Sequence, residues 1–260
     1  MKQETLDKLH ALQLDMLDLI DDFCKKNNLS YYLAYGTLLG AVRHNGFIPW
    51  DDDVDIIMPR KDYEYLEKHI SETLGEKYFF QSSYTDKYYG RSFSKIRINN
   101  TIFLEEDDSN VEGRHHGIFL DIFVMEDCGS TKGCFFAIKQ KIYKIIDSYI
   151  VLKRSNMTVP LNKKIFGILP INILIKLREL LKKGKGSNYY VEYLGITSKE
   201  AFEPAKTLNF EGKLYNVPNK YDEILTGIYG DYMQLPPIEK RVTHNPVRIS
   251  FNTEEADEQS

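Results

Sequence analysis

A run of alternating aspartates at the entrance to an apolar strand constrains this chain more than any other feature. Residues 36–58 read GTLLGAVRHNGFIPWDDDVDIIM, with Asp51, Asp53 and Asp55 placed where a turn-rich loop becomes apolar. Side chains at i and i+2 of a strand share one face, about 6–7 Å apart. Asp53 and Asp55 can therefore share one cation, with Asp51 completing the cluster. Carboxylate oxygens at a strand end suit Mg²⁺, and Mn²⁺ is also possible.

The glycine and threonine upstream of this loop favour a phosphate site. Gly36 and Thr37 follow the strand-like run 31–35 and precede an expected helix over 38–42, with Thr37 as its N-cap. The free N–H groups of that helix would face the carboxylates, which places phosphate opposite metal. An EF-hand is excluded, because Ile56 stands where its glycine is required and Asp62 where its final glutamate is required.

A third carboxylate lies on another apolar strand. Residues 117–124 read GIFLDIFV and are apolar on both faces except at Asp121, which predicts a buried central strand. An isolated buried charge costs several kcal/mol. A metal or a cationic partner would remove that penalty, so Asp121 is a candidate site residue. A carboxylate that only forms a salt bridge inside the protein remains the alternative.

Basic and aromatic residues near these segments are candidates to bind a substrate. Arginine offers a planar fork for phosphate oxygens, and basic residues end the helix after Thr37 and alternate on the strand 91–98. The candidates for phosphate contact are Arg43, His44, Lys95 and Arg97. Trp50 could stack on a base or on a quaternary ammonium group, or could serve as a hydrophobic wedge that fixes the loop.

The periodicity of the chain predicts an α/β (α+β) fold, with a mixed sheet flanked by helices. An amphipathic helix is expected over 4–27, and a second helix from Pro59 to about Leu74. Strands are expected over 78–83, 91–98, 101–105 and 117–124, with a hairpin turn at Asn99-Asn100. We expect a catalytic core over 1–130, a helical basic lobe over 131–206, a C-terminal strand-helix segment over 207–252 and a disordered acidic tail over 253–260.

The lobe carries a basic and partly apolar segment. Between residues 151 and 186, nine lysines and arginines stand against one glutamate, and Ile165–Leu181 is mostly apolar. The apolar run is too short to span a bilayer, and Pro170 and Lys176 interrupt it. It could lie at the inner face of a membrane with its lysines against anionic lipid. The alternative is an ordinary helical lobe with a solvated basic face.

Composition narrows the class of protein and its compartment. The net charge of −4 argues against nucleic acid as a partner, because proteins that neutralise phosphates carry a basic stripe. Three cysteines are too few for a disulfide framework, and the N-terminus shows no apolar signal region, so a reducing cytoplasmic setting is expected. Cys128 and Cys134, with His115 and His116 nearby, could bind zinc, but their spacing matches no standard pattern.

The motifs resemble those of the LicD family, which includes the fukutin-related proteins. The resemblance rests on residues 36–66, FSKIRINNT at 93–101, GIFLDIF at 117–123 and the block 213–237 with Arg241 and His244 after it. It implies a nucleotidyltransferase-like fold, in which a Gly-Ser or Gly-Thr pair precedes an Asp-x-Asp strand. By that resemblance Gly36, Thr37, Asp53 and Asp55 take these roles, and Asp121 supplies the third carboxylate.

The resemblance also implies an activity. Family members are understood to move a phospho-alcohol, typically phosphocholine, from a cytidine diphosphate donor such as CDP-choline to a sugar hydroxyl, and CMP is released. The acceptor expected is a sugar or lipid-linked glycan of lipopolysaccharide or teichoic acid. Positioning and electrostatics dominate such reactions, and Asp121 would help to take the proton of the hydroxyl. A true nucleotidyltransferase is the alternative, and a non-catalytic metal-binding scaffold is disfavoured.

Overall fold

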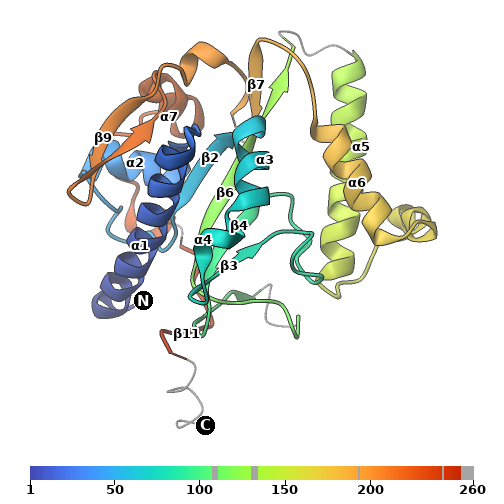
Figure 1. Ribbon diagram of the computed structural model, residues 1–260, viewed down its shortest axis with the longest axis horizontal. Helices are drawn as coiled ribbons and strands as arrows, with labels where there is room; N and C mark the ends of the chain where they lie inside the picture. Colours follow the sequence, from blue (N-terminus) through green and yellow to red (C-terminus); the bar gives the residue numbers. More distant parts are fainter. Residues whose placement is uncertain (107–110, 130–133, 193, 242, 253–260) are drawn as a thin grey trace.

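A mixed sheet forms the centre of the computed structural model, which describes residues 1–106, 111–129, 134–192, 194–241 and 243–252. The strands run in the order β1-β2-β6-β4-β3, and β7 and β8 extend the sheet from β6. β2 and β6 are parallel, and the other pairs are antiparallel. The mixed α/β sheet predicted from the sequence is therefore confirmed (Figure 1). The strands of this sheet are β1 (Tyr32–Leu33), β2 (Asp55–Pro59), β3 (Tyr78–Gln81), β4 (Ser94–Ile98), β6 (Phe119–Cys128), β7 (Asn188–Val191) and β8 (Gly195–Ser198).

Two small antiparallel sheets and a set of helices surround this sheet. One pairs β5 (Ile102–Leu104) with β11 (Arg248–Ser250), and the other pairs β9 (Lys206–Phe210) with β10 (Lys213–Val217). The α-helices are α1 (Gln3–Asn27), α2 (Tyr35–His44), α3 (Arg60–His69), α4 (Ser71–Leu74), α5 (Cys134–Arg154), α6 (Ile171–Lys182) and α7 (Tyr221–Tyr229). Short 3₁₀ helices are η2 (Leu161–Ile168), η3 (Lys199–Ala201) and η4 (Ile238–Lys240). None of the helices in the described ranges is both long and apolar enough to cross a membrane.

The first helix follows its amphipathic pattern and packs on the sheet. Leu9, Met16, Leu17 and Ile20 recur at helical spacing and are fully buried. α1 and α3 contact β6, while α2 contacts β2. The helix expected over 4–27 is therefore confirmed, and it packs on β6, the strand that carries Asp121.

The pairing of three strands brings three charged residues to one level of the sheet. Asp55 of β2 lies opposite Asp121 of β6, and Asp121 lies opposite Lys95 of β4. All three side chains are buried. Residues that are directly opposite on neighbouring strands point to the same face, so the three side chains share one face of the sheet.

Two local predictions were wrong. The Asn99-Asn100 turn does not close a hairpin, because β5 pairs with β11 rather than with β4. Thr37 is not the N-cap of α2, because that helix already begins at Tyr35, with Ala34 in the capping position. The strand expected over 117–124 is confirmed as β6, which begins at Phe119 and runs on to Cys128, where β7 supplies a further partner.

The segment after β6 divides into a helical part and strands that join the sheet. α5 and α6 pack side by side at one side of the sheet (Figure 1) and bury Ile146, Ile150, Leu174 and Ile175 between them. The strands β7 and β8, which lie within the expected lobe 131–206, pair with β6 and with each other. The acidic tail 253–260 lies outside the described residues.

Candidate active site

A buried ion pair stands beside the first carboxylate of β2. Lys95 Nζ lies 2.7 Å from Asp121 Oδ1 and donates a hydrogen bond to Oδ2 over 3.0 Å. The contact to Oδ1 lacks hydrogen-bond geometry, so this buried oxygen accepts no hydrogen bond in the described structure. Lys95 also lies 3.4 Å above the centre of the Phe119 ring, which favours its positive charge. Both oxygens of Asp121 thus lie within 3.0 Å of the Lys95 ammonium group, and only Oδ2 accepts a hydrogen bond from it.

The loop before β2 places the other aspartates beside the start of α2. Thr37 Oγ1 accepts a hydrogen bond from the backbone N–H of Asp55 over 2.8 Å, which ties the helix to the strand. A Cβ atom added to Gly36 would lie 2.6 Å from Asp51 Oδ2, so glycine makes room for that carboxylate. Tyr35 has a positive φ of 44°, an uncommon conformation that costs on the order of 1 kcal/mol for a bulky residue. The strained backbone of Tyr35 and the close contact between Gly36 and the Asp51 carboxylate therefore occur at the same turn.

The aspartates oppose each other's ionisation. Burial raises the pKa of Asp51 to about 8, and the charges of Asp53 and Asp52 add to the effect. Burial raises the pKa of Asp53 to about 6, with His244 opposing the shift and Asp121 reinforcing it. The pKa of Asp55 lies well above its ordinary value because of burial and then of Asp53 and Asp121. Excess negative charge of this kind is relieved by a cation.

A histidine from the C-terminal segment completes the cluster. His244 Nδ1 lies 2.8 Å from Asp52 Oδ1, and the backbone N–H of His244 donates to both oxygens of Asp52. Its Nε2 lies 3.7 Å from Asp53 Oδ2 and 3.8 Å from Glu105 Oε1. Burial lowers the pKa of His244, but the Asp52 hydrogen bond and the carboxylates of Asp53 and Glu105 outweigh it and raise the pKa to about 9. Asp52, Glu105 and His244 were not among the site residues predicted from sequence.

These donors fit a hard divalent cation. Carboxylate oxygens are the ligands that Mg²⁺ prefers, and Asp121 Oδ1, which contacts Lys95 but accepts no hydrogen bond from the described residues, lies buried opposite Asp55. Among the described residues, one ligand atom each from Asp52, Asp53 and His244 lies within 4.8 Å of the others. Asp53, Asp55 and Asp121 are not among the described groups whose ligand atoms approach one another this closely, so they remain the ligand set predicted from the sequence. The magnesium site stays a prediction.

Two side chains of helix α1 form hydrogen bonds with the backbone of the aspartate loop, residues 51–53. His10 Nε2 lies 2.8 Å from the carbonyl oxygen of Asp51, and Gln13 Nε2 donates to the carbonyl of Asp52 over 2.9 Å. Gln13 is fully buried. A buried polar side chain is kept in place by such bonds. The helix therefore fixes the position of the aspartate loop as well as filling the core.

Two cavities meet at the aspartates. The first has a volume of about 490 Å³ and extends over α2 and the segment 229–244, with Trp50, Arg43 and Arg241 in its wall. The second has a volume of about 760 Å³ and extends between the sheet and α5, with Lys95 and Asp121 in its wall. The residues that line both are Tyr35, Asp53, Asp55, Tyr229 and His244. The carboxylates thus lie where a ligand in one cavity would reach a ligand in the other.

The predicted substrate-binding residues divide between the cavities and the protein interior. Arg43 lines the first cavity, where it also donates to the carbonyl of Tyr232 over 2.7 Å. Trp50 lines the same cavity, and the Arg241 guanidinium lies 3.9 Å from its ring centre. His44 packs edge-on against Trp50, with 6.5 Å between the ring centres.

Arg97 is placed differently from Lys95. Its side chain is 1% exposed and donates to Gln81 Oε1 and to the carbonyl of Gly117, at 2.5 and 2.6 Å. Neither cavity is lined by it. Lys95 therefore contacts an aspartate of the site, whereas Arg97 is buried against Gln81 and Gly117, although the two residues are only two positions apart on β4.

Among the described side chains, Cys128 forms no zinc site with His115 and His116. His115 and His116 precede β6 and Cys128 ends it, so the ten-residue strand separates them by roughly 30 Å. The side chain of Cys134 lies outside the described residues. His115 is held instead by Gly117, whose N–H donates to Nδ1 over 3.1 Å, and by Asn99 Oδ1, 2.8 Å from Nε2.

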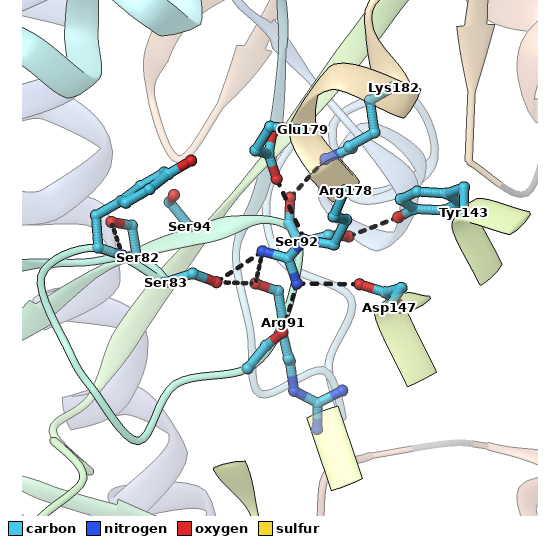
Figure 2. A network of polar contacts seen from close by, with 12 residues as sticks. Ser82, Ser83, Arg91, Ser92, Ser94, Tyr143, Asp147, Arg178, Glu179 and Lys182 are labelled. Carbon is cyan, nitrogen blue, oxygen red and sulfur yellow. Dashed lines mark hydrogen bonds and ion pairs between the residues drawn. The ribbon is translucent and has the colours of Figure 1, made fainter. Parts of the chain in front are cut away.

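Helix α6 shapes the wall of the second cavity through the segment before β4. Arg178 is 1% exposed, and its Nη1 donates to the carbonyl of Gly90 over 2.6 Å. Lys182 Nζ donates to the carbonyl of Ser92 over 2.7 Å, as Figure 2 shows. Phe93 follows directly and lines the second cavity. The lobe thus positions an aromatic ring beside the aspartates.

Comparison with known proteins identifies the domain that carries this site. Residues 28–151 match the family model described as "LicD/FKTN/FKRP, nucleotidyltransferase domain". This domain belongs to the LicD family. The matched residues include Gly36, Thr37, the aspartate loop, Lys95 and Asp121, whereas His244 lies beyond them.

Two relatives of this chain add to the family comparison. The lipopolysaccharide cholinephosphotransferase LicD of Haemophilus influenzae (strain ATCC 51907 / DSM 11121 / KW20 / Rd) is 29% identical over 265 residues, which cover 94% of this chain and 97% of the relative. An uncharacterised protein of Rickettsia prowazekii (strain Madrid E) is 42% identical over 80 residues, which cover 31% of this chain and 26% of the relative. The similarity to the Haemophilus protein therefore includes the lobe and the C-terminal segment.

Proposed function

We propose that this protein transfers phosphocholine from CDP-choline to a sugar hydroxyl of a lipopolysaccharide or teichoic acid precursor and releases CMP. The observation that carries the proposal is the meeting of the two cavities at Asp53 and Asp55. A transfer reaction needs donor and acceptor on either side of one phosphorus atom, in line with each other. The similarity to a cholinephosphotransferase over 94% of the chain supports the choice of donor.

The aspartates would hold the metal ion at that meeting point. Asp53, Asp55 and Asp121 would bind Mg²⁺, with Asp51 at the edge of the cluster beside Gly36. When bound, the ion would neutralise charge on the phosphate oxygens of the donor. Gly36 lines the first cavity at the start of α2, so phosphate could approach the backbone N–H groups of that helix closely.

Asp121 is the residue that we expect to accept the proton of the sugar hydroxyl. It lines the second cavity, and its Oδ1 accepts no hydrogen bond from the described residues. Lys95 Nζ lies 2.7 Å from this oxygen and donates to Oδ2, so the ion pair limits rotation of the carboxylate. The hydroxyl would approach from the second cavity, and the departing CMP would remain in the first, beside Trp50 and Arg43.

The walls of the second cavity suit a quaternary ammonium group. Tyr35, Phe93 and Phe123 form one aromatic cluster there, with 5.0 Å between the ring centres of Tyr35 and Phe123 and 4.6 Å between those of Phe93 and Phe123. The carboxylates of Asp147 and Glu192 lie in the same wall. Trimethylammonium groups bind to aromatic faces beside negative charge. An uncharged alcohol such as glycerol or ribitol would gain little from this wall.

An assay of the donor reaction tests the proposal. We would incubate the protein with Mg²⁺, a panel of sugars and either CDP-choline, CDP-ethanolamine or CDP-glycerol, and detect products by mass spectrometry. We expect CMP and a phosphocholine-sugar from CDP-choline, loss of both products with a chelator and recovery with Mg²⁺ or Mn²⁺. A cytidylyl-sugar with free phosphocholine would instead identify a nucleotidyltransferase.

A matched pair of variants separates loss of metal from loss of fold. Asp55→Asn should abolish CMP release, yet it should fold at least as stably as the wild type without metal, because it removes a ligand and also relieves repulsion. Asp62→Asn serves as control, since Asp62 accepts from the Ser30 N–H away from the cavities. Turnover by Asp55→Asn near the wild-type level at saturating Mg²⁺ would exclude the metal assignment.

A further inference from the structure

The short helix η2 exposes large apolar side chains to solvent. Leu161 is 82% exposed, Ile165 67% and Ile168 80%, and no residue of η2 is buried. Leu169 and Ile173 continue the exposed series into α6. We call these five side chains the η2 surface. Contiguous exposed apolar side chains of this size are rare in monomeric proteins and mark an interaction site.

The part of the chain around the η2 surface is strongly basic. Residues 134–186 contain twelve lysines and arginines against Asp147 and Glu179, a formal charge of +10 in a chain whose total is −4. Both acidic residues form ion pairs with Arg178 inside the lobe. Lys164 and Lys176 are exposed beside the apolar side chains. The η2 surface therefore consists of exposed apolar side chains that are surrounded by positively charged residues.

We propose that the η2 surface docks on a bilayer that carries anionic phospholipid headgroups. Exposed apolar side chains would enter the boundary between headgroups and acyl chains, while the lysines contact anionic headgroups. A second copy of this chain fits the surface poorly, because two lobes of charge +10 would repel each other. A contact made by surface side chains of this kind would be peripheral and reversible.

Docking would also place the second cavity beside the membrane. Asp147 and Val151 of α5 line that cavity, and α5 packs against η2 and α6. Figure 1 shows the segment between α5 and α6 projecting away from the sheet, on the side of the molecule where these helices lie. An acceptor attached to a lipid could thus reach the aspartates while the core stays in water. The docking itself does not depend on the proposed reaction.

Flotation with lipid vesicles tests the proposal without any enzymatic assay. We expect the whole protein to bind vesicles of phosphatidylcholine mixed with phosphatidylglycerol at low salt, and to bind vesicles of phosphatidylcholine alone at least about tenfold more weakly. High salt should release the bound protein. Equal binding to both kinds of vesicle, or no binding to the anionic ones, would overturn the proposal.

Variants decide whether the η2 surface makes the contact. The combined variant Leu161→Ser, Ile165→Ser and Ile168→Ser should lose at least about tenfold in vesicle binding, because each substitution removes several buried CH₂ groups from the bilayer. Leu214→Ser is the matched control, since Leu214 is 62% exposed on β10. Full binding by the triple variant would refute the assignment. So would a concentration-dependent dimer of the wild type that the triple variant abolishes.

Discussion

The buried Lys95–Asp121 pair gives the sharpest test of the site, because its charges are almost fully removed from solvent. The two side chains are 5% and 7% exposed. Lys95→Met keeps the length of the side chain and its contact with Phe119 but leaves Asp121 uncompensated. Breaking a buried pair by removing one partner costs about 3–5 kcal/mol. We therefore expect Lys95→Met to lower the free energy of unfolding by about 3 kcal/mol in the presence of a chelator.

The size of the loss translates into a measurable shift of the melting temperature. For a chain of this size 1 kcal/mol corresponds to roughly 2–4 °C, so Lys95→Met should melt about 6–12 °C below the wild type. Urea unfolding followed by circular dichroism gives the free energy directly. The double variant Lys95→Met/Asp121→Asn should recover most of the loss, since it leaves no buried charge unpaired.

Metal should reverse the defect if the aspartates bind it. Mg²⁺ would replace the lost positive charge beside Asp121, so the stability of Lys95→Met should rise more with Mg²⁺ than that of the wild type. The double variant lacks the ligand and should respond less. If Lys95→Met is as stable as the wild type with the chelator present, the ion pair has no energetic role and our reasoning on the site is wrong.

The remaining predictions concern binding, positioning and pH. Thr37→Val should lower stability by about 1–3 kcal/mol and slow turnover, because the buried N–H of Asp55 loses its acceptor, while Thr37→Ser should behave as wild type. Gly36→Ala should reduce kcat/KM by displacing Asp51, and an unchanged value would refute the close approach. Phe93→Leu should raise KM for CDP-choline by about 3–30-fold but leave CDP-glycerol unaffected; equal effects on both donors would exclude the aromatic wall. Burial and then the charge of Arg97 lower the pKa of His115 to about 4. Protonation of His115 therefore opposes folding, so stability is complete above pH 6.5 and is lost as the pH falls toward 4. The melting temperature of His115→Gln should fall less over this pH range than that of the wild type.

The local pattern of the chain was sufficient for the elements that carry the site. Alternation placed Asp53 and Asp55 at the entrance to β2, and the apolar run around Asp121 predicted the buried strand β6. The helical spacing of α1 was equally clear. These predictions succeeded because period and burial of a strand or helix are encoded within a few neighbouring residues. The role of a residue was harder to predict from the sequence where it depends on a contact with a distant segment.

The tertiary structure alone decided which residues meet. Strand pairing set Asp55, Asp121 and Lys95 at one level, and no sequence period specifies the register between strands that are distant in the chain. His244 bonds to Asp52 across 192 positions, and only the course of the chain brings them together. Thr37 was placed at a helix cap, yet its hydroxyl holds β2, because a side chain's hydrogen-bond partner depends on what packs against it. The sequence thus determined the chemistry available to the site, and long-range packing determined its geometry, since contacts between distant segments leave no local periodic signal.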